Sequence, residues 1–166
     1  MLKTNEDSGR TAAAAGGGEY LTFILGQEHY GIDILQVREI RSYEKTTRIA
    51  GAASHFLGVL NLRGAIIPIV DLRQLLAGSE TGHIGGQSAI VIVCVHEQML
   101  GLLVDGVSDV RHIEAGQMRA LPGLSSGADE DEGMMAGLAD VDGQNLLLLD
   151  LDSVARSASG RGLLAL

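Results

Sequence analysis

The feature that most constrains the fold of this 166-residue chain is a segment that occurs twice. Residues 56–72 and residues 135–151 align at a constant offset of 79, and a shorter echo at an offset of 70 links residues 30–32 with 100–102. The matched positions of the long repeat are Gly58 with Gly137, Gly64 with Gly143, Asp71 with Asp150 and Leu72 with Leu151. Both echoes combine apolar strand segments with glycine turns, which is typical of β-hairpins. The repeat therefore predicts an all-β scaffold built twice.

The turn residues and apolar runs predict four hairpins and three short helices. The paired strand segments are 20–25 with 30–33, 57–62 with 65–70, 89–95 with 99–104, and 133–141 with 144–149. The helical segments 34–37, 72–76 and 151–158 each follow an aspartate that can accept an N-terminal backbone hydrogen bond. Residues 42–55 and 114–132 are expected to be irregular. Pro68 lacks a backbone donor, so the strand 65–70 is expected at a sheet edge or beside a bulge.

The chain divides into two lobes, about 19–77 and 88–156, separated by a glycine-rich segment, and the lobes can intertwine. Each lobe has about 60–70 residues, a size at which a lone barrel is marginally stable, so the lobes are expected to share an interface. Residues 1–18 are polar and then rich in alanine and glycine, and are expected to form a disordered tail before order begins at Glu19. Residues 157–166 are expected to be a flexible C-terminus.

Composition excludes several classes of function. The formal net charge of −9 opposes binding to nucleic acid and docking on anionic membranes. The single cysteine, Cys94, makes no internal disulfide and is expected to be a buried apolar residue. The sequence has neither a run of about 20 apolar residues nor a signal-peptide core, so a cytoplasmic location is expected.

Candidate catalytic and metal-binding motifs lack their structural context. Ser125 lies in a G-x-S-x-G string, but Pro122 precedes it and an acidic run follows, which favours a surface loop over a nucleophile elbow. The five histidines lack metal-ligand spacing, and the acidic residues 129–132 lack the pattern of a calcium loop. We therefore expect neither catalysis nor a metal nor a cofactor. A serine hydrolase and an oligonucleotide-binding barrel are the rival hypotheses from other classes.

Arg63 is the most informative polar residue, because it lies at a turn tip within an otherwise apolar stretch, 57–70. One interpretation is a solvated hairpin residue, since turn tips are usually polar. The other is that Arg63 pairs with an acid such as Glu39 and shapes a binding surface.

The sequence resembles the CheW family, the adaptor of bacterial chemotaxis arrays, from about residue 19 to residue 155. The segments that carry the resemblance are YLTFILG at 20–26, YGIDILQVREI at 30–40, GVLNLRG at 58–64, PIVDLR at 68–73, GLLVDGVSDV at 101–110 and LLDLD at 148–152. The combination is specific to the family, whereas any one of these segments alone is not.

The resemblance implies two tandem five-stranded SH3-like β-barrels with short helices and a C-terminal helix. It also implies a non-enzymatic adaptor that bridges chemoreceptor tips to the histidine kinase CheA, whose regulatory domain has the same fold. Such an adaptor is expected to be a monomer alone, to form rings within arrays, and to be located at membrane-associated receptor arrays in the cytoplasm. The alternative is a CheW-like adaptor of a non-flagellar system, such as twitching or surface sensing.

The resemblance further implies a receptor site in the groove between the barrels, where a helical hairpin would dock by its apolar face. Its expected residues are Ile34, Val37, Glu39, Gly58, Arg63 and Val104. The expected kinase-binding residues are Ile66, Ile67, Ile69, Asp105 and Val107. The chain departs from the family pattern in the proline-free loop 49–55, in the acidic segment 127–133 and in the polar tail before Glu19.

Overall fold

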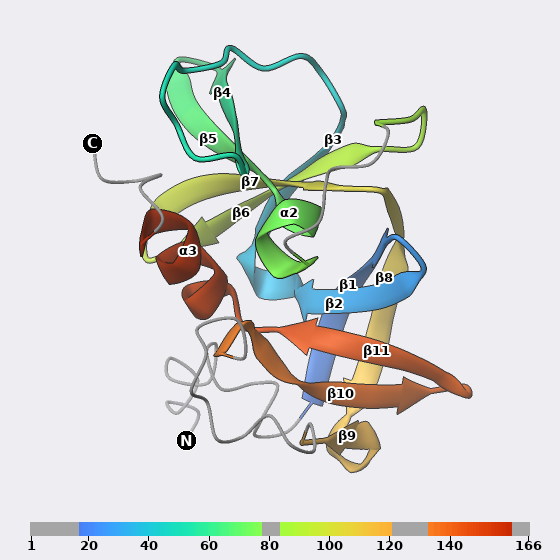
Figure 1. The fold of residues 1–166 in the computed structure, drawn as a ribbon. Helices are drawn as coiled ribbons and strands as arrows, with labels where there is room; N and C mark the ends of the chain where they lie inside the picture. The colour runs from blue at the N-terminus through green and yellow to red at the C-terminus, as the bar shows by residue number, and fades with distance from the viewer. Residues whose placement is uncertain (1–16, 78–83, 121–132, 161–166) are drawn as a thin grey trace.

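The computed structural model describes residues 17–77, 84–120 and 133–160, most of which lie in two β-sheets. Sheet A has the strand order β8-β1-β2-β11-β10-β9, and sheet B has the order β3-β6-β7-β5-β4. In Figure 1, sheet B lies above sheet A, and the helices α2 (Leu72–Ala77) and α3 (Leu151–Gly160) lie between them. This architecture confirms the predicted all-β fold class.

The elements have the following bounds. The strands of sheet A are β1 (Gly17–Leu25), β2 (Glu28–Asp33), β8 (Gly106–Glu114), β9 (Met118–Arg119), β10 (Met135–Val141) and β11 (Gln144–Leu149). The strands of sheet B are β3 (Val37–Ser42), β4 (Phe56–Leu62), β5 (Ala65–Asp71), β6 (Ala89–Val95) and β7 (Gln98–Val104). The helices are α2 (Leu72–Ala77), α3 (Leu151–Gly160) and the 3-10 turns η2 (Ile34–Gln36) and η3 (Ala115–Gln117).

The long sequence repeat corresponds to a repeated strand–turn–strand–helix unit, β4-β5-α2 and β10-β11-α3. Both hairpins turn through two residues with positive φ: 53° and 90° at Arg63 and Gly64, and 54° and 81° at Asp142 and Gly143. Such turns match the twist of the flanking strands, and glycine adopts this conformation without a steric cost. The predicted hairpins are therefore confirmed.

Each sheet contains strands from both of the segments 19–77 and 88–156. The third strand of each segment pairs with the first hairpin of the other segment. Strand β3 pairs with β6 of the β6–β7 hairpin, and β8 pairs with β1 of the β1–β2 hairpin, both antiparallel. Two parallel contacts, between β5 and β7 and between β2 and β11, complete the exchange. Gly101 lies opposite Ile69, and Gly31 lies opposite Leu148, where an added Cβ would meet the partner's side chain. These glycines allow the close approach of the strands.

Both sheets bring their edge strands together, as the predicted barrels require. After β3, Thr47 forms a bridge with Val59 of β4, which joins the two edges of sheet B. In sheet A, η3 connects the edge strands β8 and β9. The short β9 makes sheet A six-stranded, and with η3 it lies inside the segment 114–132 that the sequence predicted to be irregular.

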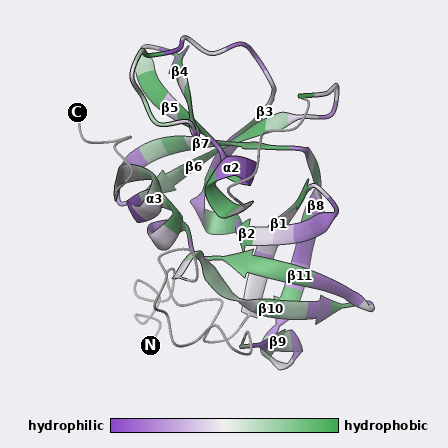
Figure 2. Ribbon diagram, viewed as in Figure 1, coloured by the Kyte–Doolittle hydropathy of each residue, from purple (hydrophilic) through white to green (hydrophobic). Residues whose placement is uncertain are grey.

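Three hydrophobic clusters hold this arrangement together. The largest contains side chains from both sheets and both α-helices, including Phe23, Val91 and Val154. A second cluster lies within sheet B around Ile69 and Ile90, and a third lies within sheet A around Tyr20 and other buried residues. Figure 2 shows the hydrophobic stretches along β5, β10 and β11 and the hydrophilic residues along β8. The shared central cluster makes the two sheets one packed unit.

Local predictions agree with the structure apart from the ends of several elements. The aspartate caps are confirmed: Asp33, Asp71 and Asp150 each accept a hydrogen bond at 3.0 Å from the backbone two residues ahead. Strand β1 begins at Gly17, earlier than expected, because residues 17 and 18 pair with β8. Helix α3 continues to Gly160, beyond the predicted end at residue 158.

The predicted edge position of Pro68 is wrong, since β5 lies between β4 and β7. The backbone of Pro68 is accommodated because the parallel β5–β7 contact begins one residue later, at Ile69. The register shift between Phe56 and Gly58 in β4 lies next to it, so the bulge alternative is the one that holds.

Candidate functional site

A chain of ion pairs runs along β3 and reaches the tip of the β4–β5 hairpin. One oxygen of Glu39 accepts a hydrogen bond from Arg63 Nη2 at 2.8 Å, and its other oxygen accepts one from Arg41 Nη1 at 2.8 Å. Arg41 also donates through Nη2 and Nε to Glu44 Oε2, at 2.6 and 3.0 Å. Arg63 therefore pairs with the acid that the sequence suggested, and the pair connects the two edges of sheet B.

This network is solvent-accessible. The hydrogen bonds from Arg63, and next those from Arg41, hold the pKa of the Glu39 carboxyl below its usual value. The side chain of Arg63 is 74% exposed, so water and salt screen the pair, and it contributes little to the stability of the fold. The exposed guanidinium is therefore available to a partner.

A hollow of about 490 Å³, lined by both apolar and polar residues, lies between the two sheets, next to this network. Ile24 of β1 and Val107 of β8 line it from sheet A, while Ile40 of β3 and Ala89 of β6 line it from sheet B. Arg41 also lines the hollow, which connects it to the ion pairs of Glu39. The hollow thus combines apolar side chains with polar ones and with a charged neighbour.

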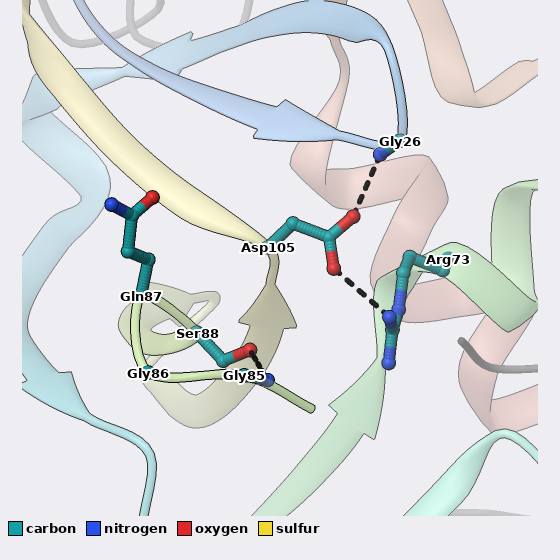
Figure 3. Close-up of a pocket in the computed structure, with 7 residues that line it drawn as sticks. All are labelled: Gly26, Arg73, Gly85, Gly86, Gln87, Ser88 and Asp105. Atoms are coloured by element: carbon teal, nitrogen blue, oxygen red, sulfur yellow. Dashed lines mark hydrogen bonds and ion pairs between the residues drawn. The ribbon is translucent and has the colours of Figure 1, made fainter. Parts of the chain in front are cut away.

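A second hollow, of about 510 Å³, adjoins the first through the shared residues 86–88. Figure 3 shows it between the β1–β2 turn at Gly26, the start of α2 at Arg73, and Asp105 at the end of β7. The backbone of Gly85 donates a hydrogen bond to the Ser88 hydroxyl at 3.0 Å and orders this side of the hollow. We call the two hollows together the intersheet groove.

The structure brings some of the expected receptor-binding residues to the surface near this groove and buries others. Glu39 and Arg63 form the exposed pair described above. Ile34 and Val37 are half-buried and pack against the central cluster. Gly58 is buried, and Val104 is completely buried, so neither offers a side chain to a partner. Val104 packs into the central cluster together with Leu100 and Leu102, on the same face of β7.

The expected kinase-binding residues separate in the same way. Ile66 on β5 is 60% exposed, whereas Ile67 and Ile69 point into the core of sheet B and are at most 2% exposed. Val107 is half-buried at the wall of the groove. Both carboxylate oxygens of Asp105 are engaged within the chain. Ile66 is thus the one member of this set with a large exposed side chain.

Several exposed apolar residues were not among the predicted site residues. Leu35 on η2 is 74% exposed, Val110 on β8 is 47% exposed and Ile40 on β3 is 46% exposed. The signal for Ile40 was in the sequence, because it lies on the same face of β3 as Arg38 and Ser42, both of which are exposed. An apolar side chain among solvated ones often marks an interaction surface.

The described residues form no cluster of three or more metal-ligating side chains. Ser125 and the acidic residues 129–132 lie outside the described residues. Cys94 is half-buried on β6 rather than fully buried as expected. Within the described segments, none of the helices has the length and apolar character that a bilayer crossing requires.

Comparison with known proteins identifies what this arrangement is similar to. Residues 19–159 match the CheW-like domain. The chain is 38% identical over 141 residues to "Chemotaxis protein CheW" of Klebsiella aerogenes, covering 85% of this chain and 83% of that protein. It is 34% identical over 139 residues to the protein of the same name in Rhizobium meliloti, covering 84% and 88%.

A solved structure has a similar fold. The crystal structure of the scaffolding protein TtCheW from Thermoanaerobacter tengcongensis aligns with a TM-score of 0.72 and 29% sequence identity. The alignment covers 80% of this chain and 88% of that chain. The resemblance therefore extends through both sheets of the fold.

Proposed function

We propose, because this chain belongs to the family of CheW-like domains, that it is a non-enzymatic adaptor that couples chemoreceptors to the histidine kinase CheA. The observation that carries this proposal is the intersheet groove, whose lining includes apolar side chains from both sheets and Arg41, the ion-pair partner of Glu39. A groove of this kind fits an amphipathic helical hairpin, such as the cytoplasmic tip of a methyl-accepting chemotaxis protein. The adaptor would then act at membrane-associated receptor arrays.

The proposed receptor site uses the expected residues in different ways. Glu39 and Arg63 contact the receptor through charged groups at the end of the groove. Ile34 and Val37 contribute apolar surface where they emerge from the central cluster. Gly58 and Val104 support the site indirectly. Both are buried, and their packing holds in place the strands that carry the contact residues.

The proposed kinase site lies around the exposed Ile66 of β5. Ile67 and Ile69 hold this strand from the inside, while Asp105 and Val107 shape the chain crossing beyond the far end of β5. Simultaneous binding through the two sites raises the effective concentration of receptor and kinase for each other. In this proposal the protein is a monomer alone and joins rings with the kinase within arrays.

The first experiment is size-exclusion chromatography with light scattering on this protein mixed with the regulatory domain of CheA from the same organism. A co-eluting complex of one copy of each is the expected result. Two separate peaks at tens of micromolar would contradict a stable kinase contact. The same experiment with the kinase of a twitching or surface-sensing system tests the non-flagellar alternative. "Protein PilI" of Pseudomonas aeruginosa covers only 54% of this chain at 29% identity, which gives that alternative less support.

The receptor contact is tested by the substitution Arg63→Glu. It should weaken binding of a receptor cytoplasmic fragment about tenfold or more, because it places two carboxylates side by side at the groove. The fold should be retained, since the side chain of Arg63 is mostly exposed. Arg119→Glu makes the same charge change on exposed β9 and serves as the matched control. Titration calorimetry with circular dichroism measures both effects, and loss of folding in Arg63→Glu would show that the residue is structural instead.

The non-enzymatic character is tested separately. We expect no hydrolysis of generic esters, and we expect Ser125→Ala to retain full receptor and kinase binding. Measurable esterase activity that disappears in the Ser125→Ala variant would instead support the hydrolase hypothesis.

A further inference from the structure

The exchange of strands makes the described chain cross between the sheets at two places. One crossing runs from β2 of sheet A to β3 of sheet B, through Asp33 and η2. The other runs from β7 of sheet B to β8 of sheet A, through Asp105. Any change in the angle between the sheets must bend the chain at these two crossings, so the contacts made there control the shape of the intersheet groove.

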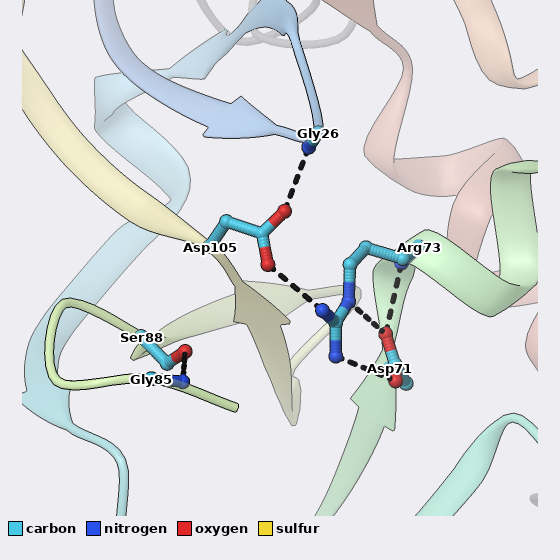
Figure 4. A network of polar contacts seen from close by, with 6 residues as sticks. All are labelled: Gly26, Asp71, Arg73, Gly85, Ser88 and Asp105. Carbon is cyan, nitrogen blue, oxygen red and sulfur yellow. Dashed lines mark hydrogen bonds and ion pairs between the residues drawn. The ribbon is translucent and has the colours of Figure 1, made fainter. Parts of the chain in front are cut away.

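Asp105 connects three separate segments at the second crossing. Its Oδ2 accepts a hydrogen bond at 2.7 Å from the backbone of Gly26, in the β1–β2 turn of sheet A. Its Oδ1 accepts one at 2.9 Å from Nη1 of Arg73, on α2, which directly follows β5 of sheet B. The backbone of Asp105 also donates to the carbonyl of Ile24 at 3.0 Å. Figure 4 shows the carboxylate between Gly26 and Arg73.

Asp71 orients the guanidinium of Arg73 toward this carboxylate. Nε and Nη2 of Arg73 donate to the two oxygens of Asp71 at 3.2 Å each, which leaves Nη1 directed at Asp105. Asp71 is fully buried and the side chain of Arg73 is 11% exposed, so solvent screens these pairs less than it screens surface pairs. A two-point contact between arginine and carboxylate also fixes the direction of the side chain.

The first crossing has no comparable connection among the described residues. Asp33 Oδ1 accepts from the backbone of Leu35, two residues away, which is a local cap. Its Oδ2 is buried and makes no hydrogen bond with another described residue. The two crossings therefore differ in their polar contacts: Asp105 hydrogen-bonds to segments of both sheets, whereas the hydrogen bond of Asp33 is local and the first crossing is held by the packing of Ile34 and Val37 against the central cluster.

We propose that the Arg73–Asp105 pair is a clamp that sets the angle between the two sheets, and that Asp105 is therefore a positioning residue for the intersheet groove. The clamp borders the second hollow directly, and the next residues of the chain, Gly106 and Val107, line the first hollow. Its effect on receptor binding rests on the proposed adaptor function, whereas its effect on sheet orientation does not.

The test measures the angle between the sheets in the full-length protein. Spin labels are placed on exposed residues of the two equivalent hairpins, at Ala65→Cys in sheet B and Gln144→Cys in sheet A, after Cys94→Ser removes the native thiol. Pulsed electron paramagnetic resonance then gives the distribution of distances between the labels. We expect a narrow distribution in the parent protein and a shifted or broader one in both Asp105→Asn and Asp105→Ala.

Asp142→Asn is the matched control, because it breaks the ion pair between Asp142 and Arg111, which lie in the same sheet. We expect an unchanged distribution for this variant. Asp105→Asn preserves the size of the side chain and leaves Arg73 paired with Asp71, so it remains informative if Asp105→Ala fails to fold. A distribution that stays unchanged in a folded Asp105→Asn variant would overturn the clamp.

A second measurement separates the clamp from the proposed function. If loosening reduces the population with a receptor-competent groove to about one tenth, the apparent Kd for a receptor fragment rises about tenfold. Affinity is measured well below the melting temperature of Asp105→Asn, which should fall because Arg73 loses one of its two carboxylate partners. A changed distance distribution together with unchanged receptor affinity would keep the clamp and reject its link to receptor binding.

Discussion

At the scale of single residues, burial separates residues that support the site from those that can touch a partner. Gly58 and Arg63 both lie in the segment 58–64 that resembles the CheW family. Gly58 is buried under the backbone of Thr47, whereas the side chain of Arg63 is mostly exposed. Gly58 has a φ of 139°, and an added Cβ would collide with the backbone of Thr47. Its role in the fold is therefore open to a direct test.

Gly58→Ala should destabilise the protein by roughly 2 kcal/mol or more, because alanine would be strained at this φ and would displace the crossing backbone. Urea unfolding measures the change. Gly116→Ala is the control, since no atom lies within 4 Å of its added Cβ, and it should stay within about 0.5 kcal/mol of the parent. Equal free energies of unfolding of the two variants would show that the backbone at Thr47 can shift away from residue 58 without loss of stability.

Tyr20 gives a pH-dependent prediction. Burial, and secondarily the charge of Asp33, raise the pKa of Tyr20 from 10.0 to about 12. The folded state favours the neutral phenol, so this contribution to stability is complete below pH 10 and is lost as the pH rises through about 12. Tyr20→Phe cannot ionise and should lose less stability across this interval in urea unfolding experiments. Parallel losses in the two proteins would contradict the raised pKa.

The same variant should be at least as stable as the parent at neutral pH. The hydroxyl of Tyr20 is buried and makes no hydrogen bond with another described residue, so its removal leaves no partner unsatisfied. A marked loss of stability at neutral pH would indicate a bound water at this position.

At the scale of elements, α2 and α3 are the matched ends of the two repeat units. Each begins after a capping aspartate, and each places leucine against the central cluster, Leu72 and Leu151 respectively. In α3, Val154 and Ala158 continue this apolar face and are completely buried. The helices therefore cover the shared cluster between the sheets rather than either barrel interior.

Val154→Asp should destabilise the protein by more than about 3 kcal/mol, because it places an unpaired carboxylate in the central cluster. Arg156→Asp, on the exposed side of the same helix, is the control and should have a small effect. Thermal unfolding followed by circular dichroism compares the two. A mild effect of Val154→Asp would mean that α3 detaches without disturbing the sheets.

At the scale of the whole molecule, the exchange of strands makes the two repeat units mutually dependent. The segment 17–77 supplies only β1 and β2 to sheet A, and in sheet B its β3 is separated from β4 and β5 by two strands of the other segment. The segment 84–160 likewise lacks the strands that join β8 to β11. Neither segment alone can complete its sheets or the central cluster.

Fragments 17–77 and 84–160 should therefore lack cooperative unfolding when prepared separately and should recover the native spectrum when mixed. Two-dimensional NMR of each fragment and of the mixture measures this, with the intact protein as reference. A separately folded fragment with dispersed resonances would show that one unit can rearrange its strands and fold independently.

The sequence by itself determined the local structure and the family. Turn chemistry at residues 63–64 and 142–143 fixed the hairpins, and aspartates at strand ends fixed the helix starts, because these interactions involve neighbours along the chain. The sequence also predicted that Arg63 pairs with Glu39, and the structure contains this pair.

Only the tertiary structure decided which strands share a sheet, which apolar residues remain exposed and what Asp105 binds. A period-two pattern is satisfied equally well beside any compatible strand, so it does not select the partner. The selection depends on the packing of both repeat units around one central cluster. For the same reason Val104 and Ile66, both apolar residues within strands, have opposite environments: one lies between the sheets, and the other faces solvent.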